Sequence, residues 1–309
     1  MLETALVALR LLQYAGAMVL MGSSLFFVYA LPPSGDGSAV QARWARPLLL
    51  GAGLLLAVAA VLGIGAQSSL LAGSVSEGLK AETLTAVVSS MNLGKAAVVR
   101  AAAALLAVIG LLALKPGRLT WIVVVVLGAI ATASLAWMGH GAATEGPLGR
   151  LHLASDVLHA LAAAVWIGAL AGFFGLLAAP SSDPTARQAL HRALHGFSGI
   201  GSALVAVLVL TGLINSWVLV GPAHLAGLWT TPYGGLLSLK LILFVAMLGL
   251  AAANRFRHTP ALGRMLAADA SPELALCTLR RSVVLETVLS LAVLALVAGF
   301  GTLPPPAAM

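Results

Sequence analysis

Hydrophobic residues in this chain occur in long runs that are separated by short stretches of Pro, Gly and charged residues. A helix needs about 20 apolar residues to cross the hydrocarbon core of a membrane. The strands of a membrane barrel would instead show alternating polarity over about ten residues. The runs have the helical length, and they predict eight transmembrane helices, at about residues 4–31, 47–72, 93–114, 119–139, 151–178, 196–220, 235–254 and 281–302.

The segments between these runs predict shorter elements. Residues 73–92 and 259–280 are amphipathic, which is typical of short helices at a membrane interface. Residues 32–37 and 115–118 are rich in Pro and Gly and predict turns. The expected fold class is therefore all-α: a polytopic integral membrane protein with a bundle of about eight transmembrane helices, in which residues 1–309 form a single integral membrane domain.

Composition supports this fold class and narrows the function. The chain is 60% hydrophobic and only 9% charged, against about 25% charged residues in a typical soluble domain. A soluble fold and a disordered chain are both excluded. The net charge of +7 fits basic loops beside an anionic membrane surface and does not indicate nucleic-acid binding. A single cysteine, Cys277, excludes an internal disulfide and a thiolate metal cluster.

The distribution of Lys and Arg over alternate loops predicts the orientation in the membrane. One side holds eleven: Arg43, Arg46, Lys115, Arg118, Arg187, Arg192, Arg255, Arg257, Arg264, Arg280 and Arg281. The other side holds three, which are Lys80, Lys95 and Arg150. The richer side is expected to be cytoplasmic, so both termini are periplasmic in the inner (plasma) membrane of a bacterium.

Polar groups inside the predicted spans are unevenly distributed in depth, and each is a candidate for function because burying it in a bilayer is costly. Most fall in the outer half: Arg10, Gln13, Gln67, Lys95, Arg100, His152, Asp156, His159, Asn215 and Lys240. In the inner half Glu286 stands almost alone. Pairing with Arg255 or Arg281 is expected for it, and a role as a proton or ion relay is the alternative. Arg10, Arg100 and Lys240 are expected to neutralise Asp156, to hold an anion or to extend to the outer interface.

The sharpest pattern lies in the span at 151–178. His152, Asp156 and His159 are spaced i, i+4, i+7, which places them within about 40° of one another on one helix face. His140 ends the preceding span, so a helical hairpin brings it level with His152 as a metal-ligand pair. His159 lies about 10 Å deeper, and it either joins the same site or forms a second one. Asp156 is expected to orient a ligating histidine through its other N–H.

The residue types favour copper as the metal. Imidazole suits copper, zinc, iron and nickel, and thioether sulfur selects Cu(I). Met138 and Met91 are weaker candidate ligands on the same side. His224, in an outer loop, lies on the right side for an entry ligand, but a role as a ligand is not expected for it. The alternative is that the histidines are hydrogen bonds between helices and the methionines fill gaps in the core.

Together these residues resemble the copper-resistance protein D (CopD) family. The resemblance covers about 139–260, with a C-terminal CopD-like region at about 192–300. It is carried by Gly139, His140, His152, Asp156, His159, Ala162 to Ala164, Trp166 and Gly168, by Phe197-Ser198, by Leu210-Thr211-Gly212-Leu213-Ile214-Asn215, by Thr231-Pro232-Tyr233-Gly234, Leu239-Lys240, Asn254-Arg255-Phe256-Arg257 and Pro260, and earlier in the chain by Gly94 and Arg100.

The resemblance implies an eight-helix inner-membrane protein for copper handling, generally regarded as moving copper from periplasm to cytoplasm. It also implies a small periplasmic copper-binding partner of the CopC type. Nothing in this chain matches such a partner, which is therefore expected to be a separate chain.

Three functions fit these observations. The first is copper uptake without enzymatic activity, in which copper binds at His140 and His152, passes to His159 and crosses near Asn215 and Lys240. The second is a membrane redox protein that binds haem b through transmembrane histidines or reduces cupric ion. The third is a copper sensor or partner subunit that does not transport.

Overall fold

The computed structural model describes residues 2–30, 43–142, 144–178, 184–268 and 271–308. The turn expected at 32–37 lies outside the described residues. Eight long helices are apolar enough to cross a membrane, which confirms the all-α prediction, and the described residues contain no strand. The eight are α1 (Leu2–Ala30), α3 (Ala45–Leu71), α6 (Asn92–Ala113), α7 (Arg118–Ala133), α8 (Gly146–Leu177), α9 (Pro184–Leu219), α11 (Pro232–Ala253) and α13 (Glu273–Phe300).

Two of these helices begin eight or more residues earlier than the hydrophobic pattern predicts. The pattern marks spans at 196–220 and 281–302, whereas α9 begins at Pro184 and α13 at Glu273. The additional turns carry charged residues such as Arg187 and Glu273. The length of a hydrophobic run reflects the thickness of the hydrocarbon core. The backbone hydrogen bonds of the helix can continue beyond that core into water.

Shorter helical elements lie between the spans. The segment at 73–92 forms α4 (Val75–Gly78) and α5 (Ala81–Ser90), and the segment at 259–280 forms α12 (Thr259–Ala267) and the first turns of α13. A π-helical turn, η4 (Asn254–His258), joins α11 to α12. The remaining short elements are η1 (Ser134–Met138), η2 (His140–Ala142), η3 (Pro222–His224), α10 (Gly227–Thr230) and η5 (Pro306–Ala308).

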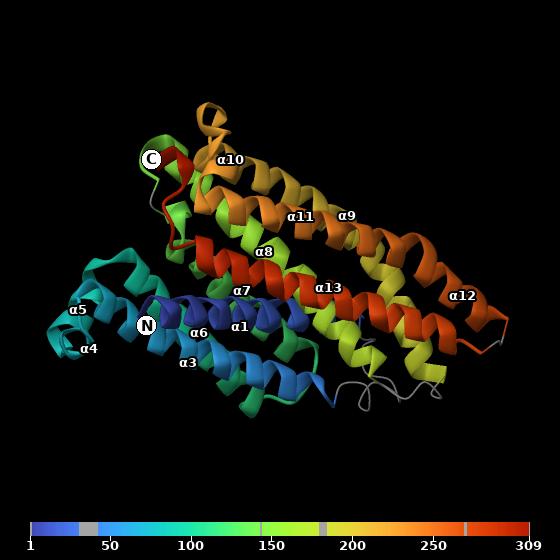
Figure 1. The fold of residues 1–309 in the computed structure, drawn as a ribbon. Coiled ribbons are helices and arrows are strands. Elements are labelled where there is room, and N and C mark those ends of the chain that lie inside the picture. The colour runs from blue at the N-terminus through green and yellow to red at the C-terminus, as the bar shows by residue number, and fades with distance from the viewer. Residues whose placement is uncertain (1, 31–42, 143, 179–183, 269–270, 309) are drawn as a thin grey trace.

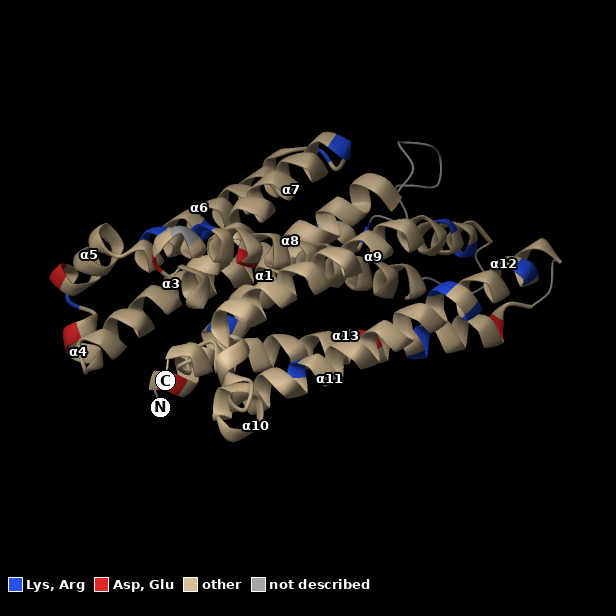
Figure 2. Ribbon diagram, turned by 90° about the horizontal axis from the view of Figure 1, so that it is seen from above, with Lys and Arg blue, Asp and Glu red and all other residues tan. Residues whose placement is uncertain are grey.

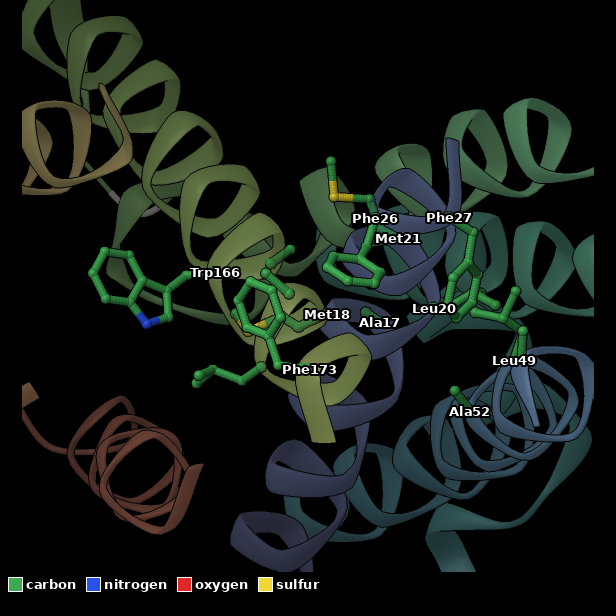
Figure 3. Packing of buried hydrophobic residues seen from close by; sticks show 14 of the residues in the cluster. Ala17, Met18, Leu20, Met21, Phe26, Phe27, Leu49, Ala52, Trp166 and Phe173 are labelled. Carbon is green, nitrogen blue, oxygen red and sulfur yellow. The ribbon is translucent and has the colours of Figure 1, made fainter. Parts of the chain in front are cut away.

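Helix α1 lies inside the bundle and packs against α3, α7 and α8, while α6 packs on α3 and α7 (Figure 1). Helix α8 links this group to a second one, because it also packs against α9 and α13, and α13 packs against α11. The main apolar core runs along α1, where Met18, Phe26 and Phe27 are buried together with Phe173 of α8 (Figure 3). The structure therefore places α8 between both groups of helices.

Glycines allow α1 and α8 to approach closely. A methyl group at Gly22 would overlap the carbonyl oxygen of Ala164, and one at Gly168 would overlap the backbone of Gly22. Small residues at such crossings let transmembrane helices pack backbone to backbone. This contact fixes α8, the helix that carries Asp156 and His159, against α1.

The charged residues are concentrated toward the ends of the bundle. Lys and Arg gather around α12, the first turns of α9 and α13, and the turn between α6 and α7, while both chain termini lie at the opposite end (Figures 1 and 2). We call the end that holds both termini the terminal end and the opposite one the basic end. An even number of spans requires both termini to share one side of the membrane.

Candidate functional site

A cluster of polar side chains lies within the bundle toward its terminal end. Four elements contribute to it: η2, α8, α9 and α11. We define the polar cluster as His140, His152, Asp156, His159, Asn215 and Lys240.

His140 and His152 are neighbours in this cluster. After α7, the chain continues through η1 and η2, and this return places His140 against α8. The His140 ring meets the ring of Tyr233 edge to face, with centroids 5.8 Å apart. His152 is fully buried on α8, against which η2 packs, and a positive charge on His140 would act on it. The two imidazoles that the sequence predicts at one height therefore lie within electrostatic reach of each other.

Burial lowers the pKa of His140 below its usual value of 6.5, and the positive charge of Arg10 acts in the same direction. A hydrogen bond to the backbone of Leu303 acts in the opposite direction but is the smaller effect. His140 is consequently neutral at pH 7, which is the form of imidazole that binds metals.

His152 has one nitrogen in use and one free. Its Nδ1 lies 2.8 Å from the hydroxyl of Thr144, whereas its Nε2 is buried without a partner among the described residues. The side-chain oxygen of Asn215, Oδ1, is likewise buried and unpartnered there. Buried polar atoms are nearly always hydrogen-bonded in folded proteins, so each of these atoms calls for an explanation.

Asp156 is held by neutral donors. The Asn215 amide donates to it across 2.6 Å, and the backbone of Gly141 also hydrogen-bonds to it. Lys240 acts on it electrostatically, but the one ion pair within 4 Å among the described residues is Lys80–Glu77. In this structure the expected partners of Asp156, a histidine or a cation, are replaced by an amide and a backbone group.

His159 is bonded to the neighbouring helix. Its Nδ1 lies 2.8 Å from the hydroxyl of Thr211, which in turn donates to the carbonyl oxygen of Val207. Among the described residues no three His, Cys, Asp or Glu side chains are grouped closely enough to hold a metal ion. The structure thus places His159 on a contact with α9, and among the described residues His140, His152 and His159 do not form a three-ligand group.

The remaining candidates occupy different surroundings. Met138 is buried, and its carbonyl oxygen accepts a hydrogen bond from Arg10. Met91 lies between α5 and α6 with 38% of its surface exposed. The ammonium group of Lys240 lies 5.8 Å from the ring centre of Phe300.

Arg100 is paired with uncharged groups and not with Asp156. It is 1% exposed, and it donates to the hydroxyl and carbonyl oxygens of Ser134 across 3.0 and 2.8 Å and also to the side chain of Gln13. It therefore joins α6 to α1 and η1. A guanidinium group has five donors in a fixed plane, and this geometry suits several acceptors on different helices.

The expected pairing of Glu286 with an arginine is wrong. The Trp166 indole donates to one Glu286 oxygen across 2.9 Å and the Asn254 amide to the other across 3.2 Å, while Arg255 donates to the hydroxyl of Ser202. Arg281 precedes Glu286 by five residues, and it therefore points about 140° away around the helix. Sequence spacing alone could exclude Arg281, but it could not find Trp166 and Asn254 on other helices.

These features define a polytopic helical membrane protein with a buried histidine and carboxylate cluster toward the end that holds its termini. The sequence model of the copper resistance protein D-like N-terminal domain matches residues 1–150, and that of copper resistance protein D matches residues 191–300. The chain belongs to the copper resistance protein D family, which confirms the resemblance seen in its motifs.

Two relatives support this assignment. Copper resistance protein D of Pseudomonas syringae pv. tomato is 35% identical over 303 residues, which cover 97% of this chain and 96% of that protein. Inner membrane protein YebZ of Escherichia coli (strain K12) is 32% identical over 127 residues, 41% of this chain and 42% of that protein. No solved structure matches. The chain is a multi-pass inner-membrane protein related to copper handling.

Proposed function

We propose that this protein takes up copper from the periplasm to the cytoplasm, and that copper first binds at His140 and His152. The observation that carries the proposal is the fully buried His152, whose Nε2 has no partner among the described residues. The Thr144 contact at Nδ1 sets the orientation of the ring and leaves Nε2 as the ligand atom. Imidazole nitrogen is a suitable ligand for copper.

The surroundings of this histidine pair favour a positively charged cargo. Asp156, one turn along α8 from His152, brings a carboxylate that has no cationic side chain within 4 Å in the described part of the chain. The free amide oxygen of Asn215 adds a second acceptor in the same cluster. A carboxylate and an amide oxygen with unused lone pairs can accept a cation or its bound water.

The direction of transport rests on the charges of the two ends. The polar cluster lies toward the terminal end, whereas most Lys and Arg residues lie at the basic end (Figure 2), which the positive-inside rule assigns to the cytoplasm. Copper would then enter from the periplasm. A separate periplasmic copper-binding protein of the CopC type is the partner that we propose for delivery.

Copper bound to the purified protein tests the first step. The variants His140→Ala and His152→Ala should each lower the affinity for copper at least about tenfold, whereas His224→Ala, in an exposed loop, is the matched control and should bind normally. Elemental analysis together with a visible spectrum also separates copper from haem, which would show an intense absorption band. Normal copper binding in both of the first two variants would refute the site.

Copper accumulation in cells tests the second step. His159→Ala should leave the His140–His152 pair occupied but abolish accumulation, because His159 lies two helical turns deeper along α8. If His159→Ala abolishes binding as completely as the other two changes, one site of three histidines is correct. If cells accumulate the same copper with and without the protein, it acts as a sensor or partner subunit and not as a transporter.

A further inference from the structure

A second site lies in the half of the bundle nearer the basic end. A cavity of about 340 Å³ opens between α8, α9, α11, the π-helical turn η4, the start of α12 and α13. Its walls are mainly apolar and aromatic, with Leu170, Phe173, Phe197 and Leu248 among them, and Glu286 and Asn254 also line it. The hydrophobic pattern predicts an inner half that is almost without polar groups, so this cavity is not visible in the sequence.

The polar atoms of the cavity are acceptors that lack a positive partner. Glu286 is 3% exposed, and both of its oxygens accept from neutral donors, those of Trp166 and Asn254. The Asn254 oxygen Oδ1 is buried without a partner among the described residues. A buried carboxylate without a counter-charge is costly inside a membrane, and the free acceptors can be satisfied by a cation.

The other polar groups at the wall do not supply that charge. The hydroxyls of Ser198 and Ser202 donate to carbonyl oxygens of their own helix, those of Leu194 and Ser198. Arg255 is the one cation among the lining residues, and its guanidinium group donates to Ser202 and lies over the ring of Phe256. Glu286 has no ion pair among the described residues.

Groups at regular spacing connect this cavity to the polar cluster. Along α11 and into the turn η4 that continues it, Lys240, Met247 and Asn254 follow one another at intervals of seven residues, which places them on one face about two turns apart. On α13, the Ser290 hydroxyl lies 3.9 Å from the Met247 sulfur and donates to the carbonyl oxygen of Glu286. A line of polar and sulfur-bearing groups therefore leads from Lys240 to the cavity.

We propose that the cavity is a cation-binding station on the inner half of the transport route, where the Glu286 carboxylate and the Asn254 amide oxygen hold the copper ion after it leaves the polar cluster. This inference rests on the proposed function. The volume is several times the roughly 30 Å³ that one water molecule occupies in the liquid, so an ion can keep part of its hydration. Oxygen ligands are harder than the nitrogen and sulfur that copper prefers, and the weaker binding suits a station that must release its ion.

Binding of Cu²⁺ alone to the purified, detergent-solubilised full chain tests the station. In a His140→Ala/His152→Ala background, which removes the first site, a weaker bound ion should remain. Adding Glu286→Gln should lower its affinity at least about tenfold. The matched control is Ser282→Ala, which changes a buried polar side chain one turn away on α13 that does not line the cavity. This control should keep the ion.

A second variant separates the loss of a ligand atom from misfolding of the protein. Asn254→Ala removes the free amide oxygen but keeps the carboxylate, so it should weaken Cu²⁺ binding by less than Glu286→Gln does. The station is overturned if the His140→Ala/His152→Ala background holds no Cu²⁺, or if Glu286→Gln and Asn254→Ala both bind as the background does. The binding results and the transport results can be distinguished. If cells with the wild-type protein accumulate no copper, the proposed function is refuted, but the Cu²⁺ binding measured for these variants is unaffected.

Discussion

The side-chain amide of Asn215 on α9 donates a hydrogen bond of 2.6 Å to the carboxylate of Asp156 on α8. This bond crosses between two transmembrane helices and stands where the sequence suggests a salt bridge. A neutral partner leaves the negative charge of Asp156 available within the cluster, while the hydrogen bond still satisfies one carboxylate oxygen. Asn215 therefore joins α9 to α8 without neutralising Asp156.

Removing this bond should destabilise the protein. Asn215→Leu leaves the Asp156 carboxylate without its amide donor, and losing a hydrogen bond to a charged group costs about 1.5–3 kcal/mol. The melting temperature in detergent should fall, while Asn92→Leu, at the exposed start of α6, should leave it unchanged. In a background with Asp156→Asn, the effect of Asn215→Leu should shrink. Equal effects in both backgrounds would show that the two residues are not coupled.

The stability of the metal-free protein should depend on pH through His140. Its pKa is lowered below 6.5 in the folded state by burial, so the unfolded chain takes up a proton first as the pH falls. The contribution of His140 is fully present above pH 6.5 and decreases as the pH drops toward the lowered pKa. Thermal unfolding at pH 7.5, 6.5 and 5.5 should therefore show a larger loss for the wild type than for His140→Phe. Parallel curves for the two proteins would contradict this assignment, and His224→Phe is the control.

The contact between α1 and α8 should not tolerate a methyl group. Gly168→Ala would overlap the backbone of Gly22, so it should separate the helices and lower the melting temperature. Gly249→Ala on α11 is the matched control, because nothing lies within 4 Å of the added carbon and alanine favours a helix by about 0.5–1 kcal/mol. Similar melting temperatures for both variants would mean that α1 and α8 pack less closely in the protein than they do in this structure.

Labelling with an impermeant thiol reagent should establish the orientation. The native Cys277 is exposed near the start of α13, at the basic end, so it should react only when the cytoplasmic face is open. In a Cys277→Ser background, Ala142→Cys should react in intact spheroplasts, because Ala142 is exposed in η2 near the polar cluster. The reverse labelling pattern would place the polar cluster on the cytoplasmic side and remove the argument for uptake.

Part of the candidate site can be predicted from the sequence alone. The i, i+4, i+7 spacing places His152, Asp156 and His159 on one face of a single helix. His140 is only a short distance from His152 along the chain, so one helical hairpin is enough to bring the two residues near each other. The hydrogen-bond partners of these residues cannot be predicted from the sequence. Thr144 and Thr211 are ordinary residues in sequence, and nothing local distinguishes them from other threonines in the chain.

What the sequence by itself determined is the set of eight membrane-spanning helices and the residue types available at each depth. Both follow from local chemistry, since the length of an apolar run must match the bilayer and each helix satisfies its own backbone. Only the tertiary structure decided which buried polar atoms meet. Glu286 binds Trp166 and Asn254, and not an arginine, because partner choice depends on how three helices rotate and cross. The cavity beside Glu286 arises in the same way, from side chains on six separate elements that no single stretch of sequence brings together.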